Sequence, residues 1–162
     1  MFVLVRAITY STLFIGFLLV FLPAQILSRA GISRPGSIGI GQAGGMILVV
    51  SGVLLAAWCI LTFVFIGRGT PAPFDPPRRL VASGPYGFVR NPMYLGALFT
   101  LAGAALFYQS WSLFVYCAFL GLSFHILVLA YEEPTLRATF GTEYDNYCHH
   151  VPRWVPRSRG AR

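Results

Sequence analysis

The sequence predicts an all-α membrane protein with about four transmembrane helices, a tight hairpin of the last two and a C-terminal cytoplasmic amphipathic helix. Hydrophobic residues make up 56% of the 162 residues and charged residues only 10%, which is too few charges for an ordinary soluble surface. The mean hydropathy of +0.68 agrees with that composition. A chain of this length predicts a single integral-membrane domain over residues 1–162.

Four apolar stretches are close to the ~20 residues that a membrane-spanning helix needs, although the third is somewhat short. They run roughly over residues 7–27, 43–66, 93–108 and 111–131. Pro23 lies late in the first stretch and is expected to bend or end it. This first stretch begins like a signal peptide, but it is too long and has no clean small-x-small cleavage site. We therefore expect it to be retained as a helix.

Only Gln109 and Ser110 separate the third and fourth stretches, which predicts a tight antiparallel helical hairpin. Small residues also recur at a spacing of four on two of the stretches, and this spacing lets helices approach closely. They are Gly52 and Ala56 on the second stretch, and Gly96, Thr100 and Ala104 on the third. For these small residues we expect a packing role alone.

Every cation behind the net charge of +7 is an arginine, because the chain has no lysine. The arginines lie beside apolar stretches, so membrane lipids are the expected partners and nucleic-acid binding is not expected. They concentrate in the loop 67–92 and in the tail 132–162, whereas the turn at Gln109 has none. The positive-inside rule then places loop, tail and both termini in the cytoplasm, for instance at a bacterial inner membrane.

One apolar and aromatic stripe marks the tail and predicts a helix that lies along the membrane surface or covers a cytoplasmic cavity. Its members are spaced four, four and three residues apart: Leu136, Phe140, Tyr144 and Tyr147. Pro134 suits the first turn of this helix. The sequence VPRWVPR that follows is expected to be extended, with Trp154 at the level of the headgroups.

A polar, turn-forming string, LVASGPYGFVRNPMY, occupies residues 80–94 between the second and third stretches. Ser83–Tyr86 reads as a turn, because Gly and Pro supply the dihedral angles that turns require. Asn91 is expected to cap the next helix, and Pro92 to occupy its first position. The backbone N–H groups there, with Arg90 beside them, favour an anionic group such as a carboxylate or a phosphate.

The second polar cluster is the acidic pair Glu132 and Glu133, at the end of the fourth stretch. The predicted hairpin returns this pair to the end of the molecule where the LVASGPYGFVRNPMY string lies. Ionisable groups beside a span often mark function. A simpler reading is that the glutamates cap the following helix and that Tyr94 belongs to an aromatic belt. The two clusters together favour a site in which Tyr86 and Tyr94 stack on a flat ring.

These motifs, in this order, resemble those of the integral-membrane methyltransferases of the isoprenylcysteine carboxyl methyltransferase and phospholipid methyltransferase group. The similarity runs from Arg78 to Pro156 and includes the string, the hairpin, the acidic pair and FGTEYDNYCHHVPRWVP. The resemblance implies methyl transfer from S-adenosyl-L-methionine, held on the cytoplasmic side without a metal. The acceptor would be a lipid or a lipophilic small molecule that enters from the membrane.

The resemblance also implies where the methyl donor binds. Nine residues are expected to contact it: Leu80, Val81, Tyr86, Asn91, Pro92, Met93, Tyr94, Glu132 and Glu133. Three residues of the tail are expected to close the site: Tyr144, Tyr147 and Arg153. The catalytic residues stay unassigned, and the candidates are Arg90, Glu133 and Arg153.

Two positions depart from the family pattern. Asn91 stands where the family usually has histidine, and asparagine cannot titrate near neutral pH, which puts a proton-transfer role there in doubt. Val128 stands where the prenylcysteine enzymes carry an arginine for the substrate carboxylate, which argues against a prenylcysteine acceptor. The identity of the acceptor and the atom that is methylated stay open.

Two other functions stay open as alternatives. Membrane sterol and steroid reductases have a similar arginine-(His/Asn)-Pro-x-Tyr motif, and Arg78 and Arg79 would suit the 2′-phosphate of NADPH. The other alternative is a non-enzymatic membrane subunit with the same fold, which Asn91 and Val128 would favour. The acidic pair and the short chain favour the methyltransferase.

The three cysteines are expected to be small apolar fillers, and two of them lie within apolar stretches. Cys59, Cys117 and Cys148 have no CxxC spacing, so neither a disulfide framework nor a zinc site is expected. His125 has no histidine partner in another apolar stretch. We therefore expect it to form a hydrogen bond to a neighbouring helix rather than to bind haem.

Overall fold

The computed structural model describes residues 16–67 and 79–156, and this part of the chain contains helices and no β-strand. Two helical runs in it are long and apolar enough to cross a membrane. They are Ile40–Ile66, with a mean hydropathy of 2.6, and Trp111–Phe140, with 2.3. Shorter apolar helices cover Gly16–Arg29 and Pro92–Tyr108. The all-α class is confirmed, whereas the number of spans stays a prediction.

The first apolar stretch begins, in the described part, with the π-helical segment η1 (Gly16–Phe21), which leads directly into α2 (Leu22–Arg29). Pro23 lies in the first turn of α2, where its missing N–H costs little. The proline therefore does not end the helix, which continues to Arg29 instead of stopping at residue 27. The predicted residues 7–15 of this stretch lie outside the described part of the chain.

The second stretch forms α3 (Ile40–Thr62), which continues as the π-helical segment η2 (Phe63–Gly67). The helix begins at Ile40 rather than at residue 43, because Gln42 stabilises its first turn. The Gln42 side chain accepts a hydrogen bond of 3.1 Å from the Gly39 N–H, as in a capping box. The end of the stretch agrees with the prediction within the usual uncertainty of helix boundaries.

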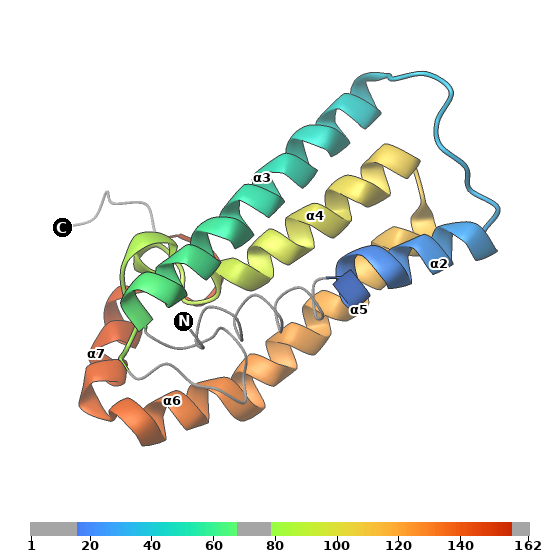
Figure 1. Cartoon of the computed structure of the whole chain (residues 1–162). Coiled ribbons are helices and arrows are strands. Elements are labelled where there is room, and N and C mark those ends of the chain that lie inside the picture. The colour runs from blue at the N-terminus through green and yellow to red at the C-terminus, as the bar shows by residue number, and fades with distance from the viewer. Residues whose placement is uncertain (1–15, 68–78, 157–162) are drawn as a thin grey trace.

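Close contact between α3 and α4 (Pro92–Tyr108) depends on glycines of both helices, which run side by side in Figure 1. A Cβ atom added to Gly52 would lie 2.5 Å from the Gly96 carbonyl oxygen. One added to Gly103 would lie 2.6 Å from the Gly45 carbonyl oxygen. The packing role predicted for Gly52 and Gly96 is confirmed, and Gly45 and Gly103 extend the same contact along the helices.

The predicted hairpin forms between α4 and α5 (Trp111–Leu127). Gln109 ends α4 in a left-handed conformation with φ 49°. The Ser110 hydroxyl accepts a hydrogen bond of 3.3 Å from the Leu113 N–H and thereby caps α5. Three buried residues of the two helices form the core of the hairpin: Leu101, Leu120 and Phe124.

The fourth stretch continues beyond its predicted end at residue 131. α5 leads through the π-helical segment η4 (Val128–Glu132) into α6 (Glu133–Phe140). Pro134 lies in the first turn of α6, as predicted, but this turn continues an existing helical run. The wider turns of η4 immediately before it accommodate the proline without a break.

The tail contains two short helices, so the prediction of one amphipathic helix is wrong. Gly141 separates α6 from α7 (Thr142–His150) with φ 53°, a conformation that glycine adopts readily. The predicted stripe is therefore divided between the two helices, with Leu136 and Phe140 on α6 and Tyr144 and Tyr147 on α7.

One end of the molecule gathers the segments that the sequence marks as functional. The loop before α4, the start of α4 and α7 all lie near the C-terminal end of α3 (Figure 1). The predicted turn is present as the 3₁₀ segment η3 (Gly84–Gly87). Gly84 has φ +60°, and a Cβ atom there would lie 3.2 Å from the Thr62 hydroxyl. This position therefore favours glycine both for its dihedral angle and for its close approach to α3.

Candidate functional site

The C-terminal segment holds the loop before α4 at two backbone positions. The Arg90 N–H donates a hydrogen bond of 2.9 Å to the carbonyl of Pro152. The Tyr147 hydroxyl donates one of 2.7 Å to the carbonyl of Tyr86. Burial, followed by the neighbouring Tyr144, raises the pKa of the Tyr147 phenol, so this side chain stays a neutral donor. Loop and tail therefore form one unit, although they are far apart in the sequence.

Three of the predicted donor-contacting residues lie together in an apolar cluster. Val81 and Tyr86 are buried against Cys59 of α3, and Met93 packs against the same cluster. Tyr86 is only 7% exposed, and Phe63 meets its ring edge-on with 5.1 Å between ring centroids. Burial raises the pKa of Tyr86 well above its usual value. Tyr86 is thus a core residue in this structure.

The start of α4 differs in one contact from the prediction. Pro92 is fully buried in the first turn, as expected. Asn91 occupies the N-cap position, but its side chain makes no capping hydrogen bond. Its Nδ2 donates instead to the Arg153 carbonyl at 3.3 Å. The predicted cap is therefore wrong, because the Asn91 amide is turned toward the tail. Leu80, another predicted contact, is half-buried at the beginning of the loop.

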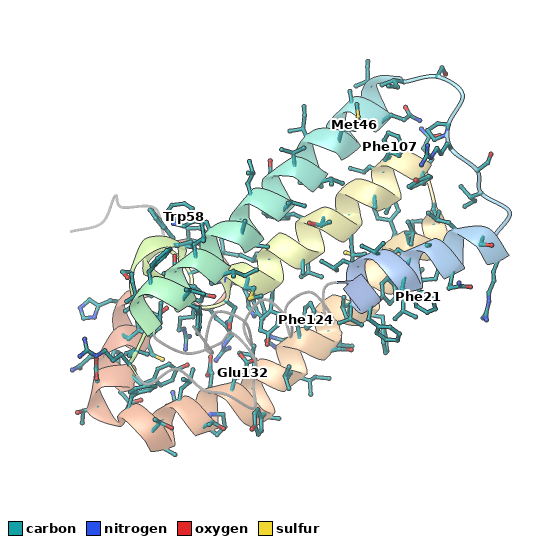
Figure 2. All side chains as sticks on the ribbon, in the orientation of Figure 1. Phe21, Met46, Trp58, Phe107, Phe124 and Glu132 are labelled. Carbon is teal, nitrogen blue, oxygen red and sulfur yellow. The ribbon has the colours of Figure 1, made fainter. Side chains whose placement is uncertain are left out.

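Tyr94 and Glu132 connect the two ends of the hairpin. The Tyr94 hydroxyl donates a hydrogen bond to Oε1 of Glu132. The Tyr94 ring stacks on Phe124 with 4.5 Å between ring centroids. Figure 2 shows Phe124 and Glu132 along the same helical run, from α5 into η4. The two polar clusters are thus side by side, as the short turn predicted.

Glu133 is the centre of a largely buried ion-pair cluster. Arg153 holds its carboxylate with two hydrogen bonds, from Nε to Oε1 at 2.7 Å and from Nη2 to Oε2 at 2.9 Å. Arg90 Nη1 donates to the same Oε1 at 3.0 Å. The side chains of Glu133 and Arg90 are 7% and 13% exposed. The hydrogen bonds to Glu133 raise the pKa of Arg153, so the cluster holds two cations and one anion.

Arg90 has donors beyond its contact with Glu133. Its Nη1 also lies 3.0 Å from the sulfur of Cys148, so this cysteine is more than the apolar filler that was expected. Its buried Nε finds no hydrogen-bond acceptor among the described residues. A buried N–H of a guanidinium without an acceptor is costly, and an anionic oxygen of a ligand would satisfy it.

The π-helical segment η4 ends at Glu132, and Glu133 begins α6 directly after it. Consecutive residues of an α-helix point about 100° apart, so Glu132 and Glu133 reach different partners. π-helical turns are frequent at functional sites. Val128, the first residue of η4, is completely buried. The position where prenylcysteine enzymes carry an arginine is thus part of the core here.

Trp154 joins the tail to α5. Its Nε1 donates a hydrogen bond of 3.1 Å to Nδ1 of His125, and its ring packs against the core of the hairpin. His125 therefore makes a hydrogen bond, as predicted, but its partner is the tail and not a neighbouring helix. This contact escaped the sequence reasoning because the path of the tail was unknown.

Within residues 16–67 and 79–156, no group of three or more His, Cys, Asp or Glu residues could hold a metal ion. Arg79 is exposed, and Arg78 lies outside the described residues. The site therefore combines a carboxylate held by a tyrosine with a cationic cluster, and these groups offer partners to charges of both signs.

The fold and the site define a helical protein with apolar, membrane-type helices and a charged site at one end. A comparison with protein-family models matches the phospholipid methyltransferase family over residues 40–143. The match covers more than half of the chain and includes the loop, the hairpin and both glutamates, so the chain belongs to the phospholipid methyltransferase family. No curated protein and no solved structure matches it.

Family membership confirms the resemblance that the motifs indicate. It indicates a methyltransferase that acts on a lipid substrate. Together with the two long apolar helices, it indicates a membrane protein. The matched region ends at residue 143, so Arg153, the bidentate partner of Glu133, lies beyond it.

Proposed function

We propose that this protein transfers a methyl group from S-adenosylmethionine to a lipid or other lipophilic acceptor. The observation that carries the proposal is the hydrogen bond from Tyr94 to Glu132 across the hairpin, next to the cluster that contains Arg90. Family membership supports methyl transfer and a lipid substrate. It also favours this function over an NADPH-dependent reductase, for which the chain offers the exposed Arg79.

The residues of the site fit S-adenosylmethionine by their chemistry. This donor carries a sulfonium and an ammonium cation, a carboxylate and a flat adenine ring. The Glu132 carboxylate suits a cationic group, and the buried Arg90 Nε without an acceptor among the described residues suits a carboxylate. We propose Tyr94, Glu132 and Arg90 as the polar contacts, with Leu80, Val81, Asn91, Pro92 and Met93 around them.

When bound, S-adenosylmethionine supplies an electrophilic methyl group on a sulfonium ion. The chain contributes positioning and exclusion of water. The Tyr94 hydroxyl holds the Glu132 carboxylate in one orientation. Val89 and Val151, next to the hydrogen-bonded Arg90 and Pro152, are buried and keep water from the junction of loop and tail.

The membrane arrangement that fits this function has four spans and places the site on the cytoplasmic side. The arginine distribution supports it. Thiol labelling of intact cells with a membrane-impermeant reagent tests it with two variants, Ser37→Cys in the exposed loop between α2 and α3 and Thr142→Cys at the start of α7. We expect labelling above the wild-type level for Ser37→Cys alone. Labelling of Thr142→Cys from outside would contradict the arrangement.

A methyl-transfer assay tests the function itself. Membranes from cells that produce the protein are incubated with S-adenosylmethionine labelled in its methyl group, and the lipids are extracted. We expect label in the lipid fraction with wild-type protein and at least about tenfold less with Glu132→Gln, because removing a charged hydrogen-bond partner typically costs 1.5–3 kcal/mol. Glu143→Gln, at an exposed position of α7, is the matched control. Label no higher than in membranes without the protein would oppose the proposal and favour a non-enzymatic subunit.

A further inference from the structure

We propose that the two neighbouring glutamates have separate roles: Glu132 meets the donor, whereas Glu133 is a positioning residue. In this account Glu133 fastens the segment 151–156 of the tail onto the loop before α4, and we call this arrangement the Glu133 latch. The role of the latch in donor binding rests on the proposed function. The existence of the latch does not rest on that function, and it can be tested without any methyl donor.

The two carboxylates differ in their hydrogen-bond partners. Both oxygens of Glu133 accept hydrogen bonds from guanidinium groups, and the side chain is 7% exposed. Charge-assisted and bidentate hydrogen bonds are the strongest of their kind, so this carboxylate is already satisfied by the protein. Glu132 accepts a hydrogen bond from the neutral Tyr94 hydroxyl. Of the two acids, Glu132 is therefore the one that retains attraction for a cationic ligand.

Glu133 and its two partners come from three different segments of the chain. Arg90 comes from the loop before α4, Arg153 comes from the tail, and Glu133 begins α6. Two backbone contacts tie the same segments together, from the Arg90 N–H to the Pro152 carbonyl and from Asn91 Nδ2 to the Arg153 carbonyl. The Glu133 carboxylate lies between two cations that would otherwise repel each other. Loss of one member of a buried ion pair leaves an uncompensated charge, so the segments should separate.

The reactivity of the Cys148 thiol can report whether the latch is open. Its sulfur lies 3.0 Å from Arg90 Nη1, and the residue is half-buried. Separation of tail and loop would expose this thiol to a small alkylating reagent. Cys117 is half-buried on α5, where its sulfur lies 3.6 Å from the Leu98 carbonyl oxygen of α4, and it serves as an internal reference in the same molecule.

The first experiment measures the alkylation rate of Cys148 by mass spectrometry in the detergent-purified full chain. Glu133→Gln and Arg153→Gln change the local charge in opposite directions, so electrostatics alone would raise the thiolate fraction of Cys148 in one and lower it in the other. Opening of the latch accelerates alkylation in both. We expect at least about a tenfold acceleration in both variants relative to Cys117, equivalent to about 1.4 kcal/mol of easier opening.

Matched variants make this result specific. Glu143→Gln and Arg34→Gln remove the same kinds of charge at exposed sites, and Arg34 lies in the loop between α2 and α3. Both should keep the wild-type rate of Cys148, as should Glu132→Gln. Acceleration in Glu133→Gln alone would assign the effect to electrostatics and overturn the latch. Should Glu133→Gln fail to fold, Arg153→Lys carries the test, because it keeps the charge without the bidentate fork and should fall between wild type and Arg153→Gln.

A double-mutant cycle on S-adenosylmethionine affinity separates positioning from contact. Glu133→Gln should weaken binding in the wild-type background but have no further effect in the Arg153→Gln background, where the latch is already open. Glu132→Gln should weaken binding in both backgrounds. An undiminished effect of Glu133→Gln in the Arg153→Gln background would show direct contact with the donor and overturn the proposal. Accelerated alkylation in a protein that binds no S-adenosylmethionine would leave the latch standing and reject the proposed function instead.

Discussion

The Tyr94 hydroxyl donates a hydrogen bond to the Glu132 carboxylate, although the two residues lie at opposite ends of a helical hairpin in the sequence. The hairpin turn at Gln109 and Ser110 makes this contact possible, because it returns the end of α5 to the start of α4.

Tyr94→Phe should weaken binding of S-adenosylmethionine by about tenfold or more, because a hydrogen bond to a charged group is worth roughly 1.5–3 kcal/mol. The stacking of the ring on Phe124 is retained, so the fold should persist. Calorimetric titration measures the change. Tyr116→Phe is the control, because the Tyr116 hydroxyl donates a hydrogen bond of 3.0 Å to the Leu18 carbonyl and makes no contact with Glu132. Equal affinities for Tyr94→Phe and wild type would place the donor elsewhere.

Asn91→Asp should destabilise the protein by about 1–3 kcal/mol, because a carboxylate cannot donate to the Arg153 carbonyl and is placed against it. Asn91→His retains a donor at this position and should be milder. Thermal unfolding in detergent compares the two. If both variants unfold at the same temperature as wild type, the contact between Asn91 and the tail contributes nothing.

Gly103→Ala should destabilise the protein by about 1–3 kcal/mol, the usual cost of overpacking a tight contact. Its Cβ atom would lie 2.6 Å from the Gly45 carbonyl oxygen and 2.7 Å from the Val49 nitrogen. Gly44→Ala, on the same helix as Gly45 but with nothing within 4 Å, should not destabilise. Thermal unfolding of the two variants in one detergent provides the comparison, and similar losses in both would disprove the close helix contact.

Ser110→Ala should lower the stability by about 1 kcal/mol, because the Leu113 N–H loses its capping acceptor. Ser112→Ala, at an exposed position of the same turn of α5, is the control and should have little effect. The free energy of unfolding, from denaturant titration in detergent, measures both. A loss for Ser112→Ala as large as that for Ser110→Ala would show that the cap is not the cause.

Local signals in the sequence predicted the parts of the fold that depend on few residues. The two-residue turn at Gln109 and Ser110 leaves room for little besides a hairpin, and this alone predicts that Glu132 returns toward Tyr94. The glycine spacing predicts the close contact of α3 and α4, because small residues four apart form a flat helix face. The family resemblance pointed to Arg153 as a residue near the site.

The sequence could not predict contacts that depend on the path of the tail. The break at Gly141 interrupts a stripe whose spacing continues unchanged, so periodicity alone suggests one helix. Asn91 has a competing partner, the Arg153 carbonyl, that only the folded tail provides. The contact of Cys148 with Arg90 also depends on where the tail lies, and so does the difference between the partners of Glu133 and those of Glu132.

The measurement that tests the central claim most directly is calorimetric titration of the detergent-purified protein with S-adenosylmethionine and, in parallel, with NADPH. Binding of S-adenosylmethionine alone, weakened by Glu132→Gln and unchanged by Glu143→Gln, is the predicted result. Binding of NADPH alone would contradict the account and assign the chain a reductase-type donor. Binding of neither ligand by a folded protein would contradict it as well, and would favour a membrane subunit without methyltransferase activity.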